Sequence, residues 1–315
     1  MLVPSFWHDY TWRAVTRNVT RVTPADMALV RAIILDEERV IIDFHTHIFG
    51  PDVRDRRDDY VRRDPAFAEM YADPKAKIAT ADDLLASMEA AGVDVSVALG
   101  FAWSDDDDIA RHNDYLLESA ARSNGRIIPF TTLNMASAAA EAEIARCAAA
   151  NARGLGELRP DSQGWDLNSG DGDRLAAAAR EHGLILLVHV TEEGGHEYPG
   201  KRGCSLAAFR EFARRHTDLA IVGAHLGGDV YRDDPSPVYV DTAAQPFLYR
   251  DDEAGAALAA VPADRLLFGS DYPLISQARA LDELRTALTS DERVSRALQG
   301  NAEALLVRVS AEPAS

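Results

Sequence analysis

The chain has 315 residues, 47% of them apolar, which is enough for one large domain or two ordinary ones with a substantial core. Its formal net charge of -18 argues against a nucleic-acid partner, because such binding relies on clustered Lys and Arg side chains. No apolar run is long enough to predict a membrane-spanning helix, and the N-terminus lacks the apolar core of a signal peptide. With only two cysteines, the chain is expected to be cytoplasmic, without a membrane partner.

Residues 1–39 precede the first expected strand and form an N-terminal extension. A helix is expected from Pro24 to about Glu38, because Thr23 suits the N-cap and proline suits the first helical position. No function is assigned to this segment.

From residue 40 onward, β-branched or apolar runs alternate with alanine-rich helical stretches. The expected strands are 40–44, 94–99, 127–131, 154–158, 184–190, 219–224, 238–241 and 265–269. The expected helices between them are 80–91, 106–123, 137–151, 171–182, 204–216, 251–260 and 276–289. Eight strands alternating with helices predict an α/β fold, a (β/α)8 TIM barrel over residues 40–308 with a tail at 309–315. A doubly wound open sheet is the alternative, but no G-x-G-x-x-G follows the first strand.

Residues 50–79 follow the first strand directly and are dense in aspartate and arginine. The simpler interpretation of this insertion is a solvated charged surface. Because loops after barrel strands line the active face, the alternative is a lid over the site.

The first strand ends in two histidines, His45 and His47, within the stretch VIIDFHTHIFG. Side chains alternate along a strand, so Asp43, His45 and His47 are expected on one side. Two neutral imidazoles at the mouth of a barrel can bind one metal ion, although H-x-H alone is a weak signal.

Four more polar residues lie at the ends of four other expected strands: Glu157, His189, His225 and Asp271. Each has a structural interpretation when taken singly, such as a hydrogen-bonded core histidine, a helix cap, or an ion pair between Glu157 and Arg159. In a barrel, however, these strand ends converge on one mouth. Together with the histidine pair they predict a metal centre.

The motifs H-x-H, G-x-G-E, a strand-end His, A-H-x-G-G and F-G-S-D-Y-P resemble the amidohydrolase superfamily. The resemblance covers roughly residues 40–308 and points to the amidohydrolase 2 branch of TIM-barrel metal-dependent hydrolases and decarboxylases. It implies that the metal ligands are His45, His47, His189 and Asp271. It also implies that His225 either binds a second metal or acts on the substrate as acid or base.

The fourth strand distinguishes subtypes of this superfamily. Many binuclear members carry there a carboxylated lysine, but the only lysines of this chain, Lys75, Lys77 and Lys201, lie elsewhere. Glu157 occupies the position, and it either bridges two ions or orients a ligand from outside the coordination sphere. The expected cofactor is Zn²⁺, one ion being favoured over two, with Mn²⁺ or another divalent ion as an alternative.

A catalytic ion with an open coordination position activates water and polarises a carbonyl group. The expected activity is hydrolysis of an amide, lactone or ester bond in a small, anionic substrate, with Asp271 and His225 as catalytic residues. The resemblance offers non-oxidative decarboxylation of an aromatic or muconate-like acid as the alternative. A barrel that binds metal or ligand without turnover is a third interpretation.

The loop TEEGGHEYPGKRG, residues 191–203, is the main candidate for substrate specificity. Four of its side chains are expected to bind an anion together with Arg159: His196, Tyr198, Lys201 and Arg202. A flexible surface turn is the simpler interpretation. Trp103 and the segment 241–250 are expected as pocket walls, against the simpler interpretation of a packed aromatic and an ordinary loop. The resemblance also allows a homodimer, which is common in the branch.

Overall fold

The computed structural model describes residues 40–192, 195–198, 201, 203–232 and 236–311. The helix expected from Pro24 to Glu38 lies outside the described residues.

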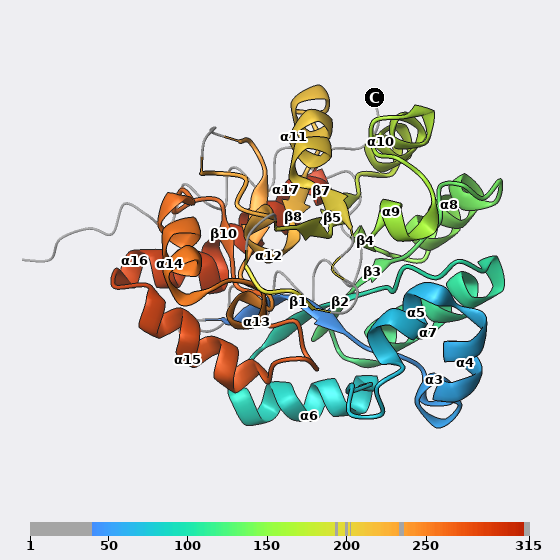
Figure 1. Cartoon of the computed structure of the whole chain (residues 1–315), viewed down its shortest axis with the longest axis horizontal. Coiled ribbons are helices and arrows are strands. Elements are labelled where there is room, and N and C mark those ends of the chain that lie inside the picture. Colours follow the sequence, from blue (N-terminus) through green and yellow to red (C-terminus); the bar gives the residue numbers. More distant parts are fainter. Residues whose placement is uncertain (1–39, 193–194, 199–200, 202, 233–235, 312–315) are drawn as a thin grey trace, which may run out of the picture.

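Eight parallel strands form one sheet at the centre of the molecule, with helices arranged around them (Figure 1). In sheet order the strands are β1 (Ile42–His47), β2 (Val95–Leu99), β3 (Ile127–Thr131), β4 (Gly154–Leu158), β5 (Ile185–Val188), β8 (Ile221–Gly223), β9 (Tyr239–Asp241) and β10 (Leu266–Leu267). These eight agree with the expected strands in number, order and position.

Backbone hydrogen bonds join the last strand to the first and close the barrel. The amide of Phe44 donates to the carbonyl of Phe268 at 2.7 Å, and the amide of Asp271 donates to the carbonyl of His45 at 2.9 Å. The amide of His47 donates to the carbonyl of Tyr272 at 2.7 Å. The prediction of a TIM barrel rather than an open sheet is confirmed.

The helices between the strands follow the predicted pattern: α6 (Ala81–Ala91), α7 (Asp106–Arg122), α8 (Ala140–Ala149), α10 (Gly170–His182), α11 (Leu206–Arg215), α14 (Asp251–Ala260) and α15 (Gln277–Ala287). Thr80 forms a capping box with Asp83 at the start of α6, and Gly92 ends this helix with a left-handed φ of 69°. Local sequence signals therefore fix where α6 begins and ends.

Shorter elements complete the barrel: α9 (Pro160–Gln163), α12 (Ala224–Gly227), α13 (Gln245–Leu248), α16 (Asp291–Ser295), the π-helix η1 (Arg296–Gly300) and α17 (Asn301–Ala311). Strands β6 (Val190–Thr191) and β7 (Cys204–Ser205) form a separate pair. The last helix, α17, packs Leu305 into a buried cluster with strand residues such as Phe44 and Leu267. Its contacts with Arg153 and Asp218, which precede β4 and β8, place it at the amino-terminal end of the barrel.

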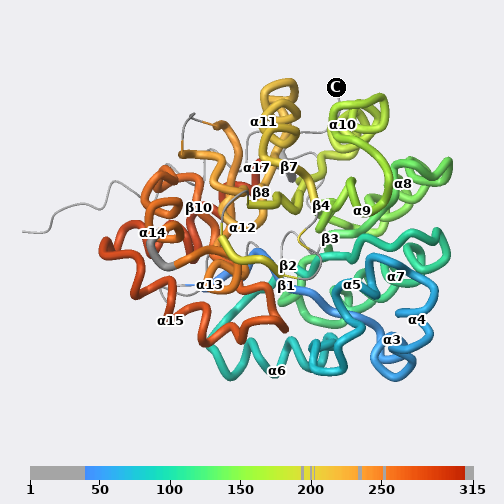
Figure 2. The backbone as a smooth tube through the Cα atoms, in the orientation of Figure 1, coloured from blue at the N-terminus to red at the C-terminus, as the bar shows by residue number. Residues whose placement is uncertain are grey.

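The insertion after β1 folds into three helices, α3 (Pro51–Asp55), α4 (Arg57–Arg63) and α5 (Pro65–Tyr71). They lie beside α7 (Figure 2), to which Arg63 is joined by an ion pair with Asp108. Their arginines and aspartates are largely exposed, as a charged surface predicts, but α5 also buries Phe67 completely. The insertion is thus a packed wall at the carboxyl-terminal side of β1.

No helix among the described residues is long and apolar enough to cross a membrane.

Candidate metal centre

The two histidines at the end of β1 face each other. Their Nε2 atoms are 3.1 Å apart, and the ring of His45 is fully buried whereas His47 keeps slight exposure. Such a spacing of ring nitrogens is compatible with two ligands of one ion, since a Zn–N bond measures about 2.0–2.1 Å.

Glu157, at the end of β4, lies between two pairs of histidines. Its Oε1 is 2.8 Å from Nδ1 of His189 and 3.1 Å from Nε2 of His225. Its Oε2 is 3.6 Å from Nε2 of His47, and Oε1 is 3.9 Å from Nε2 of His45. One carboxylate therefore contacts both sides of the cluster.

Asp271 follows β10 and completes the group. Its Oδ1 is 3.4 Å from Nε2 of His47 and 3.7 Å from Nε2 of His45. Both Asp271 and His225 have left-handed backbone conformations, with φ of 61° and 59°. Such conformations are costly for residues other than glycine and are concentrated at functional sites.

The donor set suits a divalent metal ion. Three overlapping groups have ligand atoms within 4.8 Å of one another: His45, His225 and Asp271; His45, His47 and Glu157; Glu157, His189 and His225. Imidazole nitrogens with carboxylate oxygens are the ligands of catalytic zinc and of related divalent ions. The residues present therefore fit a metal.

Two glycines make room for these rings. A Cβ atom at Gly203 would lie 2.2 Å from Cδ2 of His189, and one at Gly269 would lie 2.9 Å from Cβ of His45. Any larger residue at position 203 would displace either the imidazole of His189 or the backbone at position 203.

Asp241, at the end of β9, orients two of the histidines and was missed by the sequence analysis. Its Oδ2 accepts a hydrogen bond from Nδ1 of His45 at 2.9 Å, which leaves Nε2 of that ring for the cluster. Its Oδ1 accepts from the backbone amide of His225 at 2.9 Å. Such carboxylate–histidine contacts fix the tautomer of a ligand and raise its basicity. A carboxylate at a strand end, the signal used for Asp271, could have identified it.

Asp43, expected on the same side as His45, does not join the cluster. The pairing of β1 with β2 shifts register between Asp43 and Thr46, which breaks the strict alternation. Its carboxylate instead accepts hydrogen bonds from the amide and hydroxyl of Ser270 at 2.9 and 2.6 Å and from Gln277 at 2.8 Å. Burial raises the pKa of Asp43 to about 6 in spite of these donors.

The titratable groups of the centre shift one another's pKa values. Burial alone would raise the pKa of Asp271, but the neighbouring histidines lower it to about 2. Burial also opposes ionisation of Glu157, but its contacts with His189 and His225 hold its pKa well below the usual value. Conversely, burial would lower the pKa of His45, but the contact with Asp241 raises it to about 10. Two ionised carboxylates thus remain in a buried site.

A cavity of about 130 Å³ lies against the cluster. Its walls are His47, Met70, Tyr71, Ala76, Lys77, Gly100, Phe101, Ala102, Glu157, Arg159, His189, His225, Asp271, Pro273 and Leu274. A cavity of about 150 Å³ is known to hold benzene. The cavity, which is partly open to solvent, is therefore of a size for about one ring.

The sequence model of the family described as Amidohydrolase matches residues 42–308. This chain belongs to the amidohydrolase family. The match covers the whole described barrel from the first ligand strand to α17, and the metal-binding cluster lies entirely within it.

Several solved structures resemble this amidohydrolase. For 5-carboxyvanillate decarboxylase from Sphingomonas paucimobilis the TM-score is 0.67 at 17% identity, covering 86% of this chain and 99% of that chain. For a dihydroxybenzoic acid decarboxylase from Polaromonas with bound manganese it is 0.66 at 15% identity, covering 86% and 97%. For a probable 2-pyrone-4,6-dicarboxylic acid hydrolase from Acinetobacter baumannii it is 0.60 at 12% identity, covering 85% and 99%. At these identities the likeness shows the fold. No curated protein matches the chain.

The expected substrate residues of this amidohydrolase fall into two places. Arg159 is almost fully buried and lines the cavity beside the cluster. His196, Tyr198 and Lys201 from the loop do not line this cavity, and Arg202 lies outside the described residues. Tyr198 donates to Oε2 of Glu192 at 3.1 Å, Nζ of Lys201 lies 3.4 Å from Oε1 of Glu192, and His196 is exposed. Tyr198 and Lys201 thus contact a buried glutamate of their own loop rather than the cavity.

Trp103, expected as a pocket wall, does not line the cavity either. Its indole is 1% exposed, stacks on Phe67 with ring centroids 5.0 Å apart, and donates to Nδ1 of His112 at 2.9 Å. The neighbouring Phe101 and Ala102 line the cavity instead. The simpler interpretation, a packed aromatic, describes Trp103.

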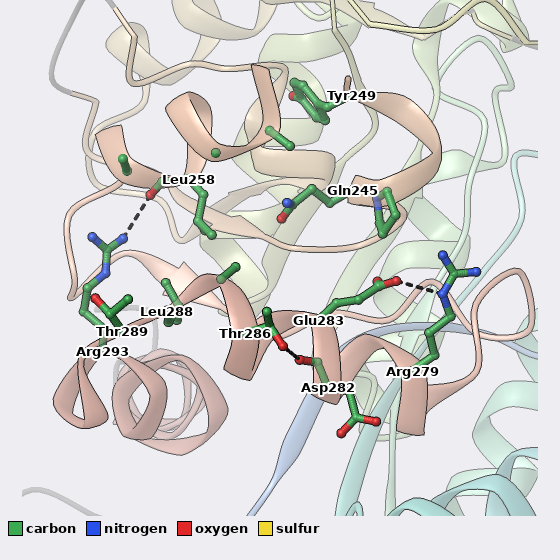
Figure 3. A pocket seen from close by; sticks show the side chains of 15 residues that line it. Gln245, Tyr249, Leu258, Arg279, Asp282, Glu283, Thr286, Leu288, Thr289 and Arg293 are labelled. Carbon is green, nitrogen blue, oxygen red and sulfur yellow. Dashed lines mark hydrogen bonds and ion pairs between the residues drawn. The ribbon is translucent and has the colours of Figure 1, made fainter. Parts of the chain in front are cut away.

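A larger hollow of about 860 Å³ lies between α13, α14 and α15 (Figure 3). It is bordered by the Arg279–Glu283 ion pair at 2.7 Å, and Arg293 donates to the carbonyl of Leu258 at 3.0 Å. None of the residues that line it is a histidine or cysteine. The smaller cavity, which contacts the ligand cluster, is therefore the candidate active site.

Proposed function

We propose that this amidohydrolase is a metal-dependent hydrolase that cleaves an amide, lactone or ester bond in a small, anionic substrate. The observation that carries the proposal is the position of Glu157, within 4 Å of all four histidines. On one side, His45 and His47 with Asp271 would hold one Zn²⁺ ion; on the other, His189 and His225 would hold a second. Glu157 would join the two, so the geometry favours two ions where the sequence favoured one.

When bound, a divalent ion lowers the pKa of a water molecule towards about 7 and polarises a carbonyl oxygen. The ionised carboxylate of Asp271 then accepts the proton of the attacking water and passes it to the leaving group. His225, whose Nδ1 donates to the carbonyl of Ala243 at 3.0 Å, presents Nε2 to the cluster. The buried guanidinium of Arg159 pairs with the anionic group of the substrate.

Decarboxylation of an aromatic acid is the second candidate. It is supported by the cavity, which is sized for about one ring, and by the decarboxylases among the structures that share the fold. In that reaction Asp271 and His225 would manage the proton delivered to carbon. The bound manganese in one of these decarboxylases makes Mn²⁺ the alternative to Zn²⁺.

Oxygen-18 water separates the two reactions. The Zn²⁺- or Mn²⁺-loaded protein would be given 2-pyrone-4,6-dicarboxylate, dihydrocoumarin and N-acetyl amino acids, and in parallel 2,6-dihydroxybenzoate and 5-carboxyvanillate. We expect the label in the acid product of one of the first group, and no turnover by the Asp271→Asn variant. Release of carbon dioxide without label in the organic product would replace the hydrolase proposal with the decarboxylase.

A further inference from the structure

The insertion after β1 supplies a wall of the cavity that no part of the proposed mechanism uses. We propose that Tyr71 and Lys77, which both lie on this insertion, recognise the substrate: Lys77 pairs with a second acidic group, and the hydroxyl of Tyr71 donates a hydrogen bond. The substrate class that follows is a small acid with two acidic groups. The inference rests on the proposed function for the location of the substrate, but not on the kind of bond that is broken.

Tyr71 is held rigidly by other aromatic rings. Its ring stacks on Phe67 with centroids 4.6 Å apart and meets Phe49 edge to face at 5.4 Å and Phe101 at 5.9 Å. Among the described residues its hydroxyl has no hydrogen-bond partner, although the residue lines the cavity. Burial raises its pKa, with Asp271 and Glu157 adding to the effect, so the phenol stays protonated beside the carboxylates. Tyr71 therefore offers a hydrogen-bond donor, fixed by packing, at the wall of the cavity.

Lys77 stands at the end of a turn that Arg57 fixes in place. The guanidinium of Arg57 donates to the carbonyl of Asp73 at 2.9 Å and to that of Ala76 at 2.6 Å. The amide of Ala76 also donates to the carbonyl of Asp73 at 2.9 Å. The backbone that carries Lys77 to the cavity is thus ordered before a substrate arrives.

The charge of Lys77 is available for a ligand. Within the described part of the chain, Lys77 forms no hydrogen bond or ion pair, whereas Lys201 is engaged with Glu192. Lys77 is exposed and Arg159 is almost fully buried, so the two cations line the open and the closed side of one cavity. Two separated cations on the walls of one small site favour a ligand with two anionic groups.

Part of the cavity wall is apolar. Met70 and Leu274 line it while remaining 37% and 49% exposed, and the buried Phe101 lines it as well. Large exposed apolar side chains at the rim of a pocket are typical of a ligand-binding surface. An aromatic ring or short carbon chain between the two acidic groups would cover them.

Binding of paired probes tests the inference without turnover. Isothermal titration calorimetry of the Zn²⁺-loaded protein would compare isophthalate with benzoate, and glutarate with butyrate. We expect the wild type to bind each diacid about fivefold more tightly than its monoacid, the value of one partly exposed ion pair. The Lys77→Met variant should lose this preference and Lys77→Glu should reverse it. The matched control, Lys75→Met, removes an exposed lysine that does not line the cavity and should keep the preference.

Tyr71→Phe keeps the aromatic packing and removes the hydroxyl. It should weaken the binding of both members of each pair by about fivefold, as expected for one hydrogen bond. Tyr239→Phe, outside the cavity, should change nothing. Absence of a diacid preference in the wild type, or its persistence in both Lys77 variants, overturns the inference. The two proposals can fail separately. If the Lys77 variants lose the diacid preference but the protein releases carbon dioxide instead of hydrolysing its substrate, the inference about Lys77 stands and only the hydrolase proposal is refuted.

Discussion

Oδ2 of Asp241 lies 2.9 Å from Nδ1 of His45, and both side chains are completely buried. The same carboxylate holds the backbone of His225 through its other oxygen. Asp241, which does not line the cavity, therefore sets the orientation of two candidate metal ligands. Its replacement should weaken metal binding.

We expect Asp241→Asn to lower the Zn²⁺ affinity by about 10- to 100-fold, the usual effect of removing such a partner. Competition with a fluorescent chelator measures this directly. Asp264, an exposed carboxylate in the segment before β10, gives the control variant Asp264→Asn. Unchanged affinity in a folded Asp241→Asn protein would contradict the assigned role.

Replacement of Glu157 by Gln should separate the two halves of the cluster. Because Glu157 contacts both histidine pairs, the wild type is expected to bind two Zn²⁺ ions and Glu157→Gln one. Mass spectrometry under native conditions and elemental analysis count the ions. One ion in both proteins would restore the one-metal arrangement that the sequence favoured.

Zinc uptake should release protons. Neighbouring carboxylates overcome the effect of burial and raise the pKa of His45 to about 10 and that of His225 to about 9, so both rings carry a proton near pH 7 in the metal-free protein. A metal ligand must give up that proton. We expect release of one to two protons for a fully loaded site, measured by calorimetry in buffers of different ionisation enthalpy, and metal affinity that falls as the pH is lowered from 9 to 6. Affinity independent of pH would contradict this.

His112 should make the fold sensitive to acid. Burial lowers the pKa of His112 from 6.5 to about 4, and its ring is held between the indole of Trp103 and the carbonyl of Ile48. As the pH falls, His112 of the unfolded chain takes up a proton near pH 6.5, whereas the buried ring takes it up only near pH 4. The stability contributed by the neutral ring is therefore complete above pH 6.5 and is lost as the pH falls to 4. At about 1.4 kcal/mol for each pH unit, the loss amounts to about 3 kcal/mol.

Denaturant unfolding of wild type and His112→Asn at several pH values between 4 and 7 tests this. The variant is less stable throughout because it loses hydrogen bonds, so the comparison concerns the slope with pH. An equally steep slope in both proteins would show that other groups cause the acid sensitivity.

The barrel and most of its cluster could be predicted from sequence because the signals are local. Each of His47, Glu157 and His189 lies at or directly after the end of a short apolar run, and the carboxyl ends of barrel strands meet at one mouth. The register shift in β1 could not be foreseen, since period-two alternation places Asp43 beside His45 and only the pairing with β2 breaks it.

Other features depend on contacts between distant segments. The role of Asp241 follows from the position of β9 next to β8 and near β1, which the sequence of β9 does not encode alone. Tyr71 was not predicted as a site residue, because the many charged residues of the insertion indicated an exposed surface rather than buried aromatic packing. Lys201 was expected at the substrate because it is isolated in sequence, yet Glu192, nine residues earlier in the same loop, lies against it.

The seam between β10 and β1 has a consequence for biosynthesis. The amide of Asp271 bonds to the carbonyl of His45, so the first and last metal-binding segments become neighbours only when this seam forms. A nascent chain that has emerged as far as β9 already contains five of the six cluster residues but has no seam. High-affinity metal binding should therefore begin when the barrel closes. A bound ion would then mark only those chains whose synthesis has passed the last strand.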